Sequence, residues 1–438
     1  MVEPELLHTM PDETAPPIGG GEPHGGDATK RVEMSGEEAM ALLREGKVVT
    51  NARVGGLKFV GVVPFAVSFR GCVLVKPEFR GATFAEAVSI IACTIDRAQF
   101  NRKTTFAKNV TLDGSVLQKT AIRDVTVAGE LFAAHTEFKG KVSFQGCDFG
   151  GAVHFWEAQF HTWASFQGCT FRGQADFRSV HAADGFVVEK CHFLGDFLFR
   201  GANVEKKFSA DGSRFDKLLD LSKAKLRDFA YLESIVAGPA QTFAFLNAVA
   251  ERVRVHPKQV EGRLLSEREG RHDDAMQEYG LLKKCYGQLH RFDAEDWAFY
   301  RFKVAQRRAT GTTWRRPWTK WRWLAEWLFL DIGCGYGTNP LRAVRMAAVI
   351  VVGFALIYGF NVQEFYTDKL PFPERDREGF ANAAMIGLTT SVSVFTSGMG
   401  GIRELAKGWM NVPVMVESVM GTLLFGLFIV AFSRKVIR

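Results

Sequence analysis

The stretch that decides the fold runs from Phe138 to Phe177 and reads FKGKVSFQGCDFGGAVHFWEAQFHTWASFQGCTFRGQADF. Two series of phenylalanines run through it, each with a spacing of eleven residues: Phe138, Phe149, Phe160 and Phe171, and Phe144, Phe155, Phe166 and Phe177. The steps therefore alternate between five and six residues, which matches neither the 3.6-residue period of a helix nor the two-residue period of a strand. Self-similarity at a short fixed period indicates a solenoid.

The same register continues on both sides of this stretch. Downstream, the positions at these spacings are Ala182, Val188, Phe193, Phe199, Val204, Ala210, Phe215, Leu221, Leu226 and Leu232. Upstream, Phe79, Phe84, Ile95, Phe100 and Phe106 follow the same steps with slips. We predict a β-solenoid over residues 50–235, with four sides and about 22 residues per coil, roughly seven coils and a length of about 34 Å. Each buried Phe stabilises it by about 1.5–3 kcal/mol, and only stacked neighbouring coils can bury it.

This ladder resembles the pentapeptide-repeat family, and the resemblance implies a right-handed quadrilateral β-helix. Cys147, Cys169 and Cys191 are 22 residues apart and should stack in one column. The column is either a metal or redox ladder or a set of small buried residues. We favour buried residues, because no His accompanies the cysteines at ligand spacing. Because no Ser/His/Asp set, carboxylate pair or phosphate loop stands out, we expect neither an enzyme nor a bound cofactor.

The segments that flank the solenoid have other patterns. Residues 1–30 are rich in Pro and Gly and predict a disordered tail. Residues 31–49 predict a short leading helix, with a capping box formed by Ser35 and Glu38. Residues 236–312 predict a cytoplasmic helical linker, in which a helix at about 239–254 packs against an antiparallel hairpin that caps the solenoid. The basic pairs Lys283-Lys284 and Arg307-Arg308 either touch lipid headgroups or form solvated helix faces.

Residues 313–343 form a segment in which Trp alternates with Arg and Lys. Its five tryptophans are Trp314, Trp318, Trp321, Trp323 and Trp327. This composition is typical of a membrane-interface belt. It is also found where proteins bind single-stranded nucleic acid. Because the segment precedes an apolar span, we predict contact with membrane lipid and no nucleic-acid partner.

Residues 344–438 contain two apolar spans. The 18 residues between Arg345 and Glu364 carry no charge, and residues 412–432 carry only Glu417. Eighteen helical residues reach about 27 Å, close to the thickness of a bilayer. Residues 380–398, between the spans, are too few to cross a bilayer and too apolar for an ordinary surface loop, which predicts a re-entrant helix followed by a turn. The plan is typical of a tetrameric cation pore, and the alternative is a helical hairpin that only anchors the chain.

The run from Glu417 to Lys435 resembles the inner helix of two-transmembrane, pore-loop subunits of the potassium-channel type. These combine a Glu near the helix top, a Gly one turn later and a basic exit. The resemblance implies a homotetramer whose second span lines the pore, and the residues assigned to this inner helix are Glu417, Gly421, Thr422, Phe425 and Ile429. Glu417 either braces the filter from behind or shapes the outer vestibule. Gly421 and Gly426 serve either as a hinge or as points of close helix packing.

The family's filter reads Thr-Val-Gly-Tyr-Gly-Asp. The match chosen in this chain runs from Ser391 to Thr396 and lacks the glycines. The residues assigned to the pore loop and filter are Thr389, Thr390, Ser391, Val392, Ser393, Val394 and Phe395. The resemblance therefore implies the pore plan and permeant monovalent cations, but not potassium selectivity. The outer acids Glu364, Asp368, Glu374, Asp376 and Glu378 are expected to concentrate cations at the mouth.

The distribution of charge predicts the membrane topology, and the cysteines indicate the redox compartment. The net charge is +7, and basic residues precede the first span and follow the second, which predicts a multi-pass protein of the cell (inner) membrane with both termini in the cytoplasm. Seven scattered cysteines fit a reducing compartment. We therefore expect an ion channel whose cytoplasmic solenoid senses an unknown ligand or protein, or holds the assembly together. The alternatives are a membrane-anchored scaffold and, disfavoured by the basic balance, a DNA-mimicking rod.

Overall fold

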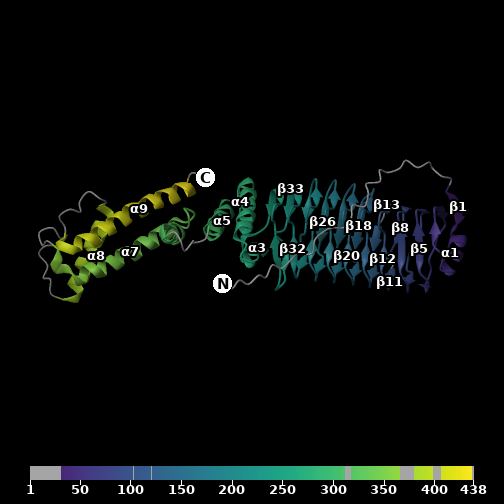
Figure 1. Ribbon diagram of the computed structural model, residues 1–438, viewed down its shortest axis with the longest axis horizontal. Helices are drawn as coiled ribbons and strands as arrows, with labels where there is room; N and C mark the ends of the chain where they lie inside the picture. Colours follow the sequence, from purple (N-terminus) through teal and green to yellow (C-terminus); the bar gives the residue numbers. More distant parts are fainter. Residues whose placement is uncertain are drawn as a thin grey trace, which may run out of the picture.

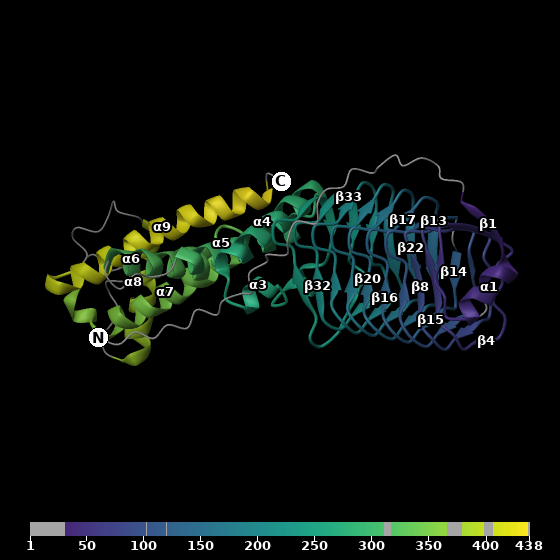
Figure 2. The same cartoon turned by 45° about the vertical axis from the view of Figure 1, so that its right-hand side comes forward.

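The computed structural model describes residues 31–101, 103–119, 121–310, 317–365, 379–397 and 406–436. Figure 1 shows a long β-solenoid followed by a helical region that ends in a bundle of apolar helices. The tail predicted at residues 1–30 lies outside the described residues. The turned view in Figure 2 shows the helices continuing from one end of the solenoid.

The solenoid consists of short parallel strands stacked in three sheets. One sheet has ten strands: β2 Val49–Thr50, β5 Val67–Arg70, β8 Val88–Ile91, β12 Val110–Thr111, β16 Leu131–Phe132, β20 Val153–His154, β24 Ala175–Asp176, β28 Phe197–Leu198, β32 Leu218–Asp220 and β35 Thr242–Ala244. The second has nine: β4 Val62–Val63, β7 Thr83–Phe84, β11 Thr105–Phe106, β15 Thr126–Val127, β19 Asp148–Phe149, β23 Thr170–Phe171, β27 His192–Phe193, β31 Arg214–Phe215 and β34 Val236–Ala237.

The third sheet has seventeen strands and covers two sides of the coil. Its strands are β1 Val32–Ser35, β3 Ala52–Gly55, β6 Val73–Val75, β9 Thr94–Asp96, β10 Gln99–Phe100, β13 Val116–Gln118, β14 Ala121–Arg123, β17 Glu137–Phe138, β18 Val142–Gln145, β21 Gln159–Phe160, β22 Ala164–Gln167, β25 His181–Ala182, β26 Phe186–Glu189, β29 Asn203–Val204, β30 Phe208–Ser209, β33 Lys225–Tyr231 and β36 Val249–Arg254. In the middle of the rod, each coil therefore contributes four short strands, one per side.

The strand register confirms the coil of 22 residues. Phe138 pairs with Phe160, and Phe144 pairs with Phe166. The rings stack face to face up the interior: the Phe144 and Phe166 centroids lie 4.6 Å apart, with planes inclined by 3°. Equivalent places on successive coils hold apolar residues, so each ring is covered by the side chains of the neighbouring coils, as Phe166 is by Phe144 and Val188. The ladder seen in the sequence is thus the hydrophobic core.

The solenoid is longer than the sequence analysis predicts. Ten strands are stacked in one sheet, which corresponds to about 43 Å at about 4.8 Å per spacing. The helix predicted at about 239–254 is wrong, because this segment forms β35 and β36. Thr242–Ala244 pairs with Leu218–Asp220, and the side chain of Phe243 is fully buried. Stacking on the preceding coil overrides the helical propensity of the Ala-rich sequence.

Both ends of the solenoid are covered by helices. At the start, α1 Gly36–Arg44 has the predicted capping box: the Ser35 hydroxyl accepts from the Glu38 N–H, and the Glu38 carboxylate accepts from the Ser35 N–H. Ala39 and Leu43 of α1 join the solenoid core. At the other end, α4 His272–Gln288 contributes Leu282 and Tyr286 to the same core. The helices therefore protect the open ends from further strand pairing.

A buried carboxylate fastens the second cap. Oε1 of Glu278 in α4 accepts from the Phe245 N–H at 2.6 Å, and its other oxygen accepts from the Ser266 hydroxyl. Burial raises the pKa of Glu278, although both hydrogen bonds act in the opposite direction. Glu278 thus joins the last coil to the helical region through backbone and side-chain contacts.

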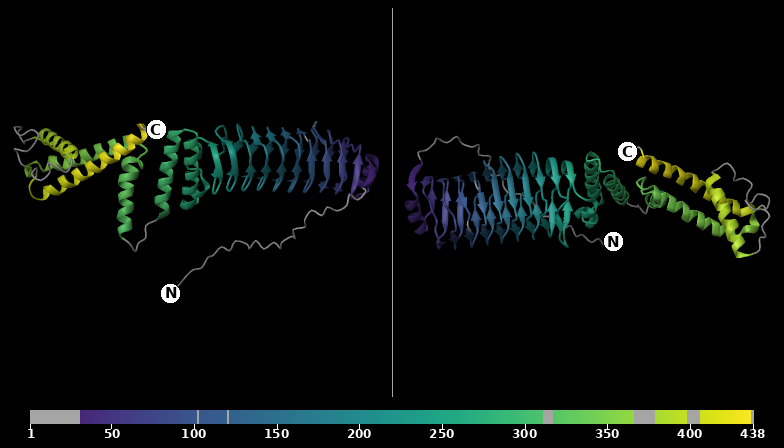
Figure 3. Two further views of the ribbon diagram at one scale, coloured as in Figure 1. Left: turned by 90° about the horizontal axis from the view of Figure 1, so that it is seen from above. Right: turned by 180° about the vertical axis from the view of Figure 1, so that it is seen from behind.

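The remaining helices lead away from the solenoid, as both views of Figure 3 show. They are α2 Pro257–Val260, α3 Leu265–Arg268, α5 Phe292–Thr310, α6 Pro317–Ala325, the π-helix η1 Glu326–Gly333, α7 Pro340–Phe360, the 3₁₀ turn η2 Val362–Glu364, α8 Phe380–Ser397, the 3₁₀ turn η6 Gly408–Met410 and α9 Asn411–Val436. Helices α4 and α5 form the predicted hairpin. Two helical segments, Pro340–Phe360 and Gly408–Val436, are long and apolar enough to cross a membrane, each with a mean hydropathy of 2.1.

Candidate functional site

The candidate functional site is the bundle of the apolar helices α7, α8 and α9. Helix α7 leads away from the solenoid and α9 returns toward it, so that the C-terminal end of α9 lies beside α5 (Figure 1). Helix α8 packs against both α7 and α9 at the end of the bundle far from the solenoid. We refer to α7, α8 and α9 as the apolar bundle.

Glycines set how closely these helices approach one another. A Cβ on Gly421 of α9 would collide with the carbonyl group of Phe395 in α8, and a Cβ on Gly387 of α8 would collide with the carbonyl of Ala355 in α7. A Cβ on Gly426 would meet no atom within 4 Å. Small residues at such crossings are typical of helices that associate in membranes. Of the two roles predicted for Gly421, close packing is the one supported by these contacts.

Glu417 joins α9 to α8 inside the apolar bundle. Its side chain is fully buried, and Oε1 is in hydrogen-bond contact with the hydroxyl of Ser391. The same hydroxyl lies 2.9 Å from the carbonyl oxygen of Val351 in α7, so Ser391 bridges all three helices. The contact therefore ties α9 to α8 at Ser391.

Other buried polar atoms surround this contact. Thr390, Ser418 and Tyr358 are almost completely buried. The hydroxyls of Thr390 and Ser418 have no hydrogen-bond partner among the described residues, whereas the Tyr358 hydroxyl interacts with the Glu417 carboxylate. An unpaired polar atom costs free energy in an apolar interior, and intramembrane ionisable residues usually face a water-filled cavity or carry a function. The apolar bundle therefore encloses a cluster of buried polar groups around Glu417.

The seven residues assigned to the filter all lie within α8. The helix extends to Ser397, and Thr390, Ser391 and Val394 face inward whereas Val392 and Ser393 are exposed. The hydroxyl of Thr389 donates to the Met385 carbonyl at 2.9 Å, as is usual for a helical Thr. Helical carbonyl groups are directed at the next turn of their own helix. In this conformation Thr389–Phe395 present no row of carbonyls to an ion, and the re-entrant turn expected after the helix lies outside the described residues.

The sequence analysis missed a second match to the filter pattern, which begins at the end of α8. Residues 396–401 read Thr-Ser-Gly-Met-Gly-Gly, so Thr396, Gly398 and Gly400 coincide with the Thr and both Gly of the six-residue filter pattern quoted above. Residues 398–401 lie outside the described residues. The signal that would have revealed this match is the spacing of the two glycines. An alignment on these glycines begins at Thr396, five residues after the alignment that begins at Ser391.

The residues assigned to the inner helix occupy two faces of α9. Glu417 and Gly421 are buried against α8, whereas Thr422, Phe425 and Ile429 are exposed. Of the interface tryptophans, Trp318, Trp321 and Trp327 are exposed, Trp323 is half-buried and stacks on Trp327, and Trp314 lies outside the described residues. Four of the predicted outer acids, Asp368, Glu374, Asp376 and Glu378, also lie outside the described residues.

Two polar contacts connect the linker helix α5 to the apolar bundle. Asp331 of η1 is buried, forms an ion pair with Arg307 at 2.5 Å and accepts from the Tyr300 hydroxyl at 2.8 Å. The guanidinium of Arg342, in the first turns of α7, lies 4.8 Å from the Tyr300 ring centroid.

The second contact is made by α9. Arg434 forms an ion pair with Asp296 of α5 at 3.0 Å and lies 4.4 Å from the ring centroid of Phe299. The linker is thus tied to the start of one apolar helix and to the end of the other.

The cysteine column of the solenoid is made of small buried residues. The thiols of Cys169 and Cys191 lie 3.5 and 3.4 Å from the carbonyl oxygens of Phe144 and Phe166 on the preceding coil. Ser213 occupies the next place in this column, and its hydroxyl donates to the Val188 carbonyl at 2.7 Å. Within the described ranges, no cluster of three or more His, Cys, Asp or Glu side chains is suited to hold a metal ion.

Comparison with known families agrees with the solenoid geometry. Residues 122–170 and 133–181 match the family model described as pentapeptide repeats (9 copies). We refer to the solenoid, whose middle part carries this match, as the pentapeptide-repeat domain. Searches of curated proteins and of solved structures found no match to the chain. The matched residues of the pentapeptide-repeat domain lie entirely within the rod, so arguments about the apolar bundle rest on its own residues.

Proposed function

We propose that the chain is one subunit of a membrane ion channel, with the apolar bundle forming the pore module and the pentapeptide-repeat domain in the cytoplasm. The observation that carries this proposal is the contact between Glu417 and Ser391. An anchoring hairpin needs no carboxylate inside the hydrocarbon layer, where such a group costs several kcal/mol by the usual scales. A pore helix held from behind by the inner helix needs such a contact.

The filter is assigned to residues 396–401 in this proposal, and not to Thr389–Phe395. Successive carbonyl groups can point toward a common axis only where the backbone adopts angles that side chains resist, which is why filters contain glycine. Thr396-Ser-Gly-Met-Gly-Gly401 contains three glycines directly after α8. The Tyr of the potassium pattern is Met399 here, so we propose a pore that conducts monovalent cations and make no assignment of potassium selectivity.

Oligomerisation follows from the same geometry. One bundle of three helices cannot enclose a passage, and the exposed side chains of Phe425 and Ile429 on α9 provide a surface for other copies around an axis. A homotetramer is the assembly that the pore plan implies. Arg434 and Lys435 at the end of α9, and Arg342 and Arg345 at the start of α7, support a cytoplasmic location for both ends.

The pentapeptide-repeat domain is proposed to act on the pore through α5. Because Arg342 connects the linker helix to the start of α7 and Arg434 connects it to the end of α9, a displacement of the rod is passed to both helices. A partner or ligand that binds the rod would shift the pore only if it binds one arrangement more tightly than another. If no ligand binds one arrangement more tightly than the other, the proposed role of the rod is to hold the subunits together.

The proposal is tested by reconstituting the purified chain into planar bilayers. Under a tenfold KCl gradient, a cation-selective pore should reverse near the cation equilibrium potential, at about 59 mV. Glu417→Gln and Ser391→Ala should reduce the current or its open time, whereas Ser393→Ala, exposed on the same helix, serves as the matched control.

Two results would count against the channel. If the folded wild-type chain gives no current under any gradient, the membrane-anchored scaffold is the remaining function. If a current reverses at zero potential under the gradient, the pore does not select cations.

A further inference from the structure

A cavity of about 40 Å³ lies inside the pentapeptide-repeat domain, in the part of the rod between β8 and β20 (Figure 1). Every residue that lines the cavity is Val, Leu, Ile or Phe, and no polar atom of the described residues contributes to its surface. Neither the proposed pore nor the contacts of the linker use this cavity.

The cavity lies at a break in the ladder of phenylalanines. In one inward column, Val127 stands between Phe106 and Phe149. Phe106 stacks on Phe84 of the preceding coil, with ring centroids 4.9 Å apart. Phe149 stacks on Phe171 of the following coil at the same centroid distance. The other faces of the Phe106 and Phe149 rings meet a Val side chain, which is smaller than a ring, so they lack part of their packing contacts.

A second inward column has the same gap. Ile122 pairs with Phe100 on one side and with Phe144 on the other, so it also stands where the neighbouring coils have rings. The described part of residues 107–137 contains no buried Phe, so the gap extends around a whole coil. Phe100 and Ile122 each keep 7% of their accessible surface, whereas the well-packed Phe166 keeps none. Residual surface is expected for side chains that border a free space.

The apolar wall decides what can occupy the cavity. A buried water molecule needs roughly 10–15 Å³ and two or more polar partners. The cavity has the volume for water but offers it no partner, so we expect it to be dry. An engineered cavity of about 150 Å³ with a similar lining stays dry and binds benzene or xenon. Because the cavity beside Val127 is smaller, its ligand must be smaller than benzene.

We propose that this cavity binds a small nonpolar molecule, of the size of a xenon atom or a short hydrocarbon, between the rings of Phe106 and Phe149. The ligand supplies the dispersion contacts that a Phe in place of Val127 would make. It therefore stabilises the coils on both sides of the gap. Binding does not depend on conduction, so its failure is distinguishable from failure of the proposed channel.

The test compares the full chain in detergent under xenon and under helium at equal pressure, with hydrogen exchange followed by mass spectrometry. A ligand that binds only the folded coils should slow exchange in the peptides of β11, β15 and β19 by about twofold when the dissolved xenon concentration equals its Kd, and by more at higher pressure. The proposal is overturned if these peptides exchange equally fast under both gases, or if the apolar bundle is slowed as much as they are.

Two substitutions on β15 make the test specific to the cavity. Val127→Phe fills the free space and should abolish the effect of xenon. Thr126→Val, on the exposed side of the same strand, should keep it. If Val127→Phe opens the coil, which faster exchange under helium would reveal, Ile122→Phe fills the space from the second column. A filled variant that responds to xenon as strongly as Thr126→Val would also overturn the proposal.

Discussion

Replacing Phe166 by alanine is expected to loosen the middle of the pentapeptide-repeat domain. The ring of Phe166 is fully buried, stacks on Phe144 with centroids 4.6 Å apart, and meets Phe177 edge-on at 5.4 Å. Truncating a buried Phe to Ala costs about 3–5 kcal/mol, because apolar burial is lost and a cavity remains. A coil contacts only the coils on either side, so the cost falls on those two interfaces.

This energy converts into a measurable loss of amide protection. At about 1.36 kcal/mol for each tenfold change, 3–5 kcal/mol corresponds to about 150-fold to about 5,000-fold faster exchange. Hydrogen exchange followed by mass spectrometry on the full chain in detergent resolves the peptides of β21, β22 and β23 from those of the apolar bundle. Phe166→Leu, which keeps part of the side chain, should give a smaller acceleration.

A matched control is available on the same strand. Ser165 precedes Phe166, points to the outside of the rod and is half-exposed. Ser165→Ala should change exchange by less than about threefold, in line with surface substitutions of about 0.5 kcal/mol. The stacked-ring account is refuted if Phe166→Ala exchanges within fivefold of the wild type, or if the acceleration appears in the apolar bundle and not in the coils around Phe166.

Three further predictions concern the helical region. Gly421→Val should separate α9 from α8 and lower the Tm in detergent by several degrees. Gly426→Val, where a Cβ meets open space, should leave the Tm nearly unchanged. Equal Tm values for both variants would contradict the packing role of Gly421. In a denaturant titration, Asp331→Ala should destabilise the fold by about 3–5 kcal/mol, because Arg307 would remain buried without its partner. The control Asp293→Ala removes an exposed ion pair and should cost less than about 1 kcal/mol. Because burial raises the pKa of Glu278 in the folded chain, the folded state binds its proton more tightly than the unfolded state, and stability should fall as pH rises from the ordinary value of about 4.5 through the raised one. Glu278→Gln should therefore match the wild type near pH 4 and exceed its Tm at pH 8, and an unchanged pH profile would show that Glu278 does not titrate in this range.

The parts of the fold that depend on local periodicity could be predicted from the sequence. Alternating steps of five and six residues place Phe144 and Phe166 in equivalent positions on neighbouring coils, and the structure stacks them as expected. The capping box at Ser35 and the hairpin of α4 and α5 follow from short-range patterns as well. In each case the physical cause lies within one coil or a few helical turns, so the sequence displays it directly.

Other features were decided by the tertiary structure. Residues 242–254 contain helix-forming residues, yet they become strands because β32 and β33 offer unpaired edges for them to complete. The extent of α8 to Ser397 depends on its contacts with α7 and α9.

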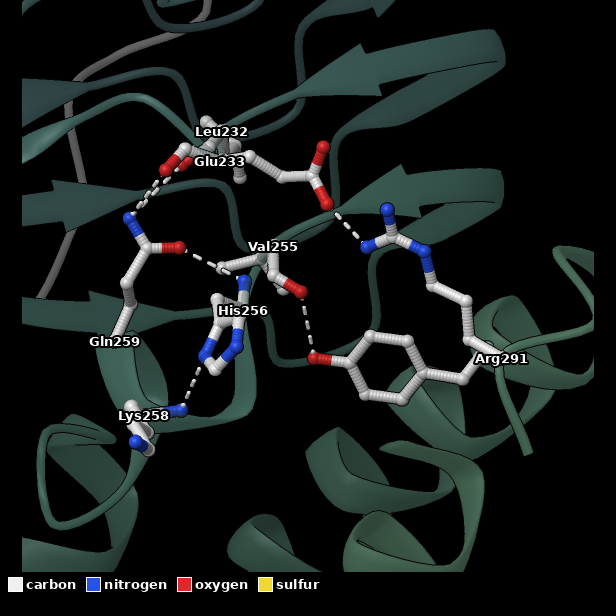
Figure 4. Close-up of polar contacts among 8 residues, drawn as sticks. Leu232, Glu233, Val255, His256, Lys258, Gln259 and Arg291 are labelled. Atoms are coloured by element: carbon white, nitrogen blue, oxygen red, sulfur yellow. Dashed lines mark hydrogen bonds and ion pairs between the residues drawn. The ribbon is translucent and has the colours of Figure 1, made fainter. Parts of the chain in front are cut away.

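Tertiary packing likewise joins Glu233 of the last coil to Arg291 after α4 (Figure 4), which no spacing in the sequence connects. Periodicity records what a residue does with its near neighbours along the chain. Long-range packing brings together groups whose distance in the sequence carries no information about their distance in space.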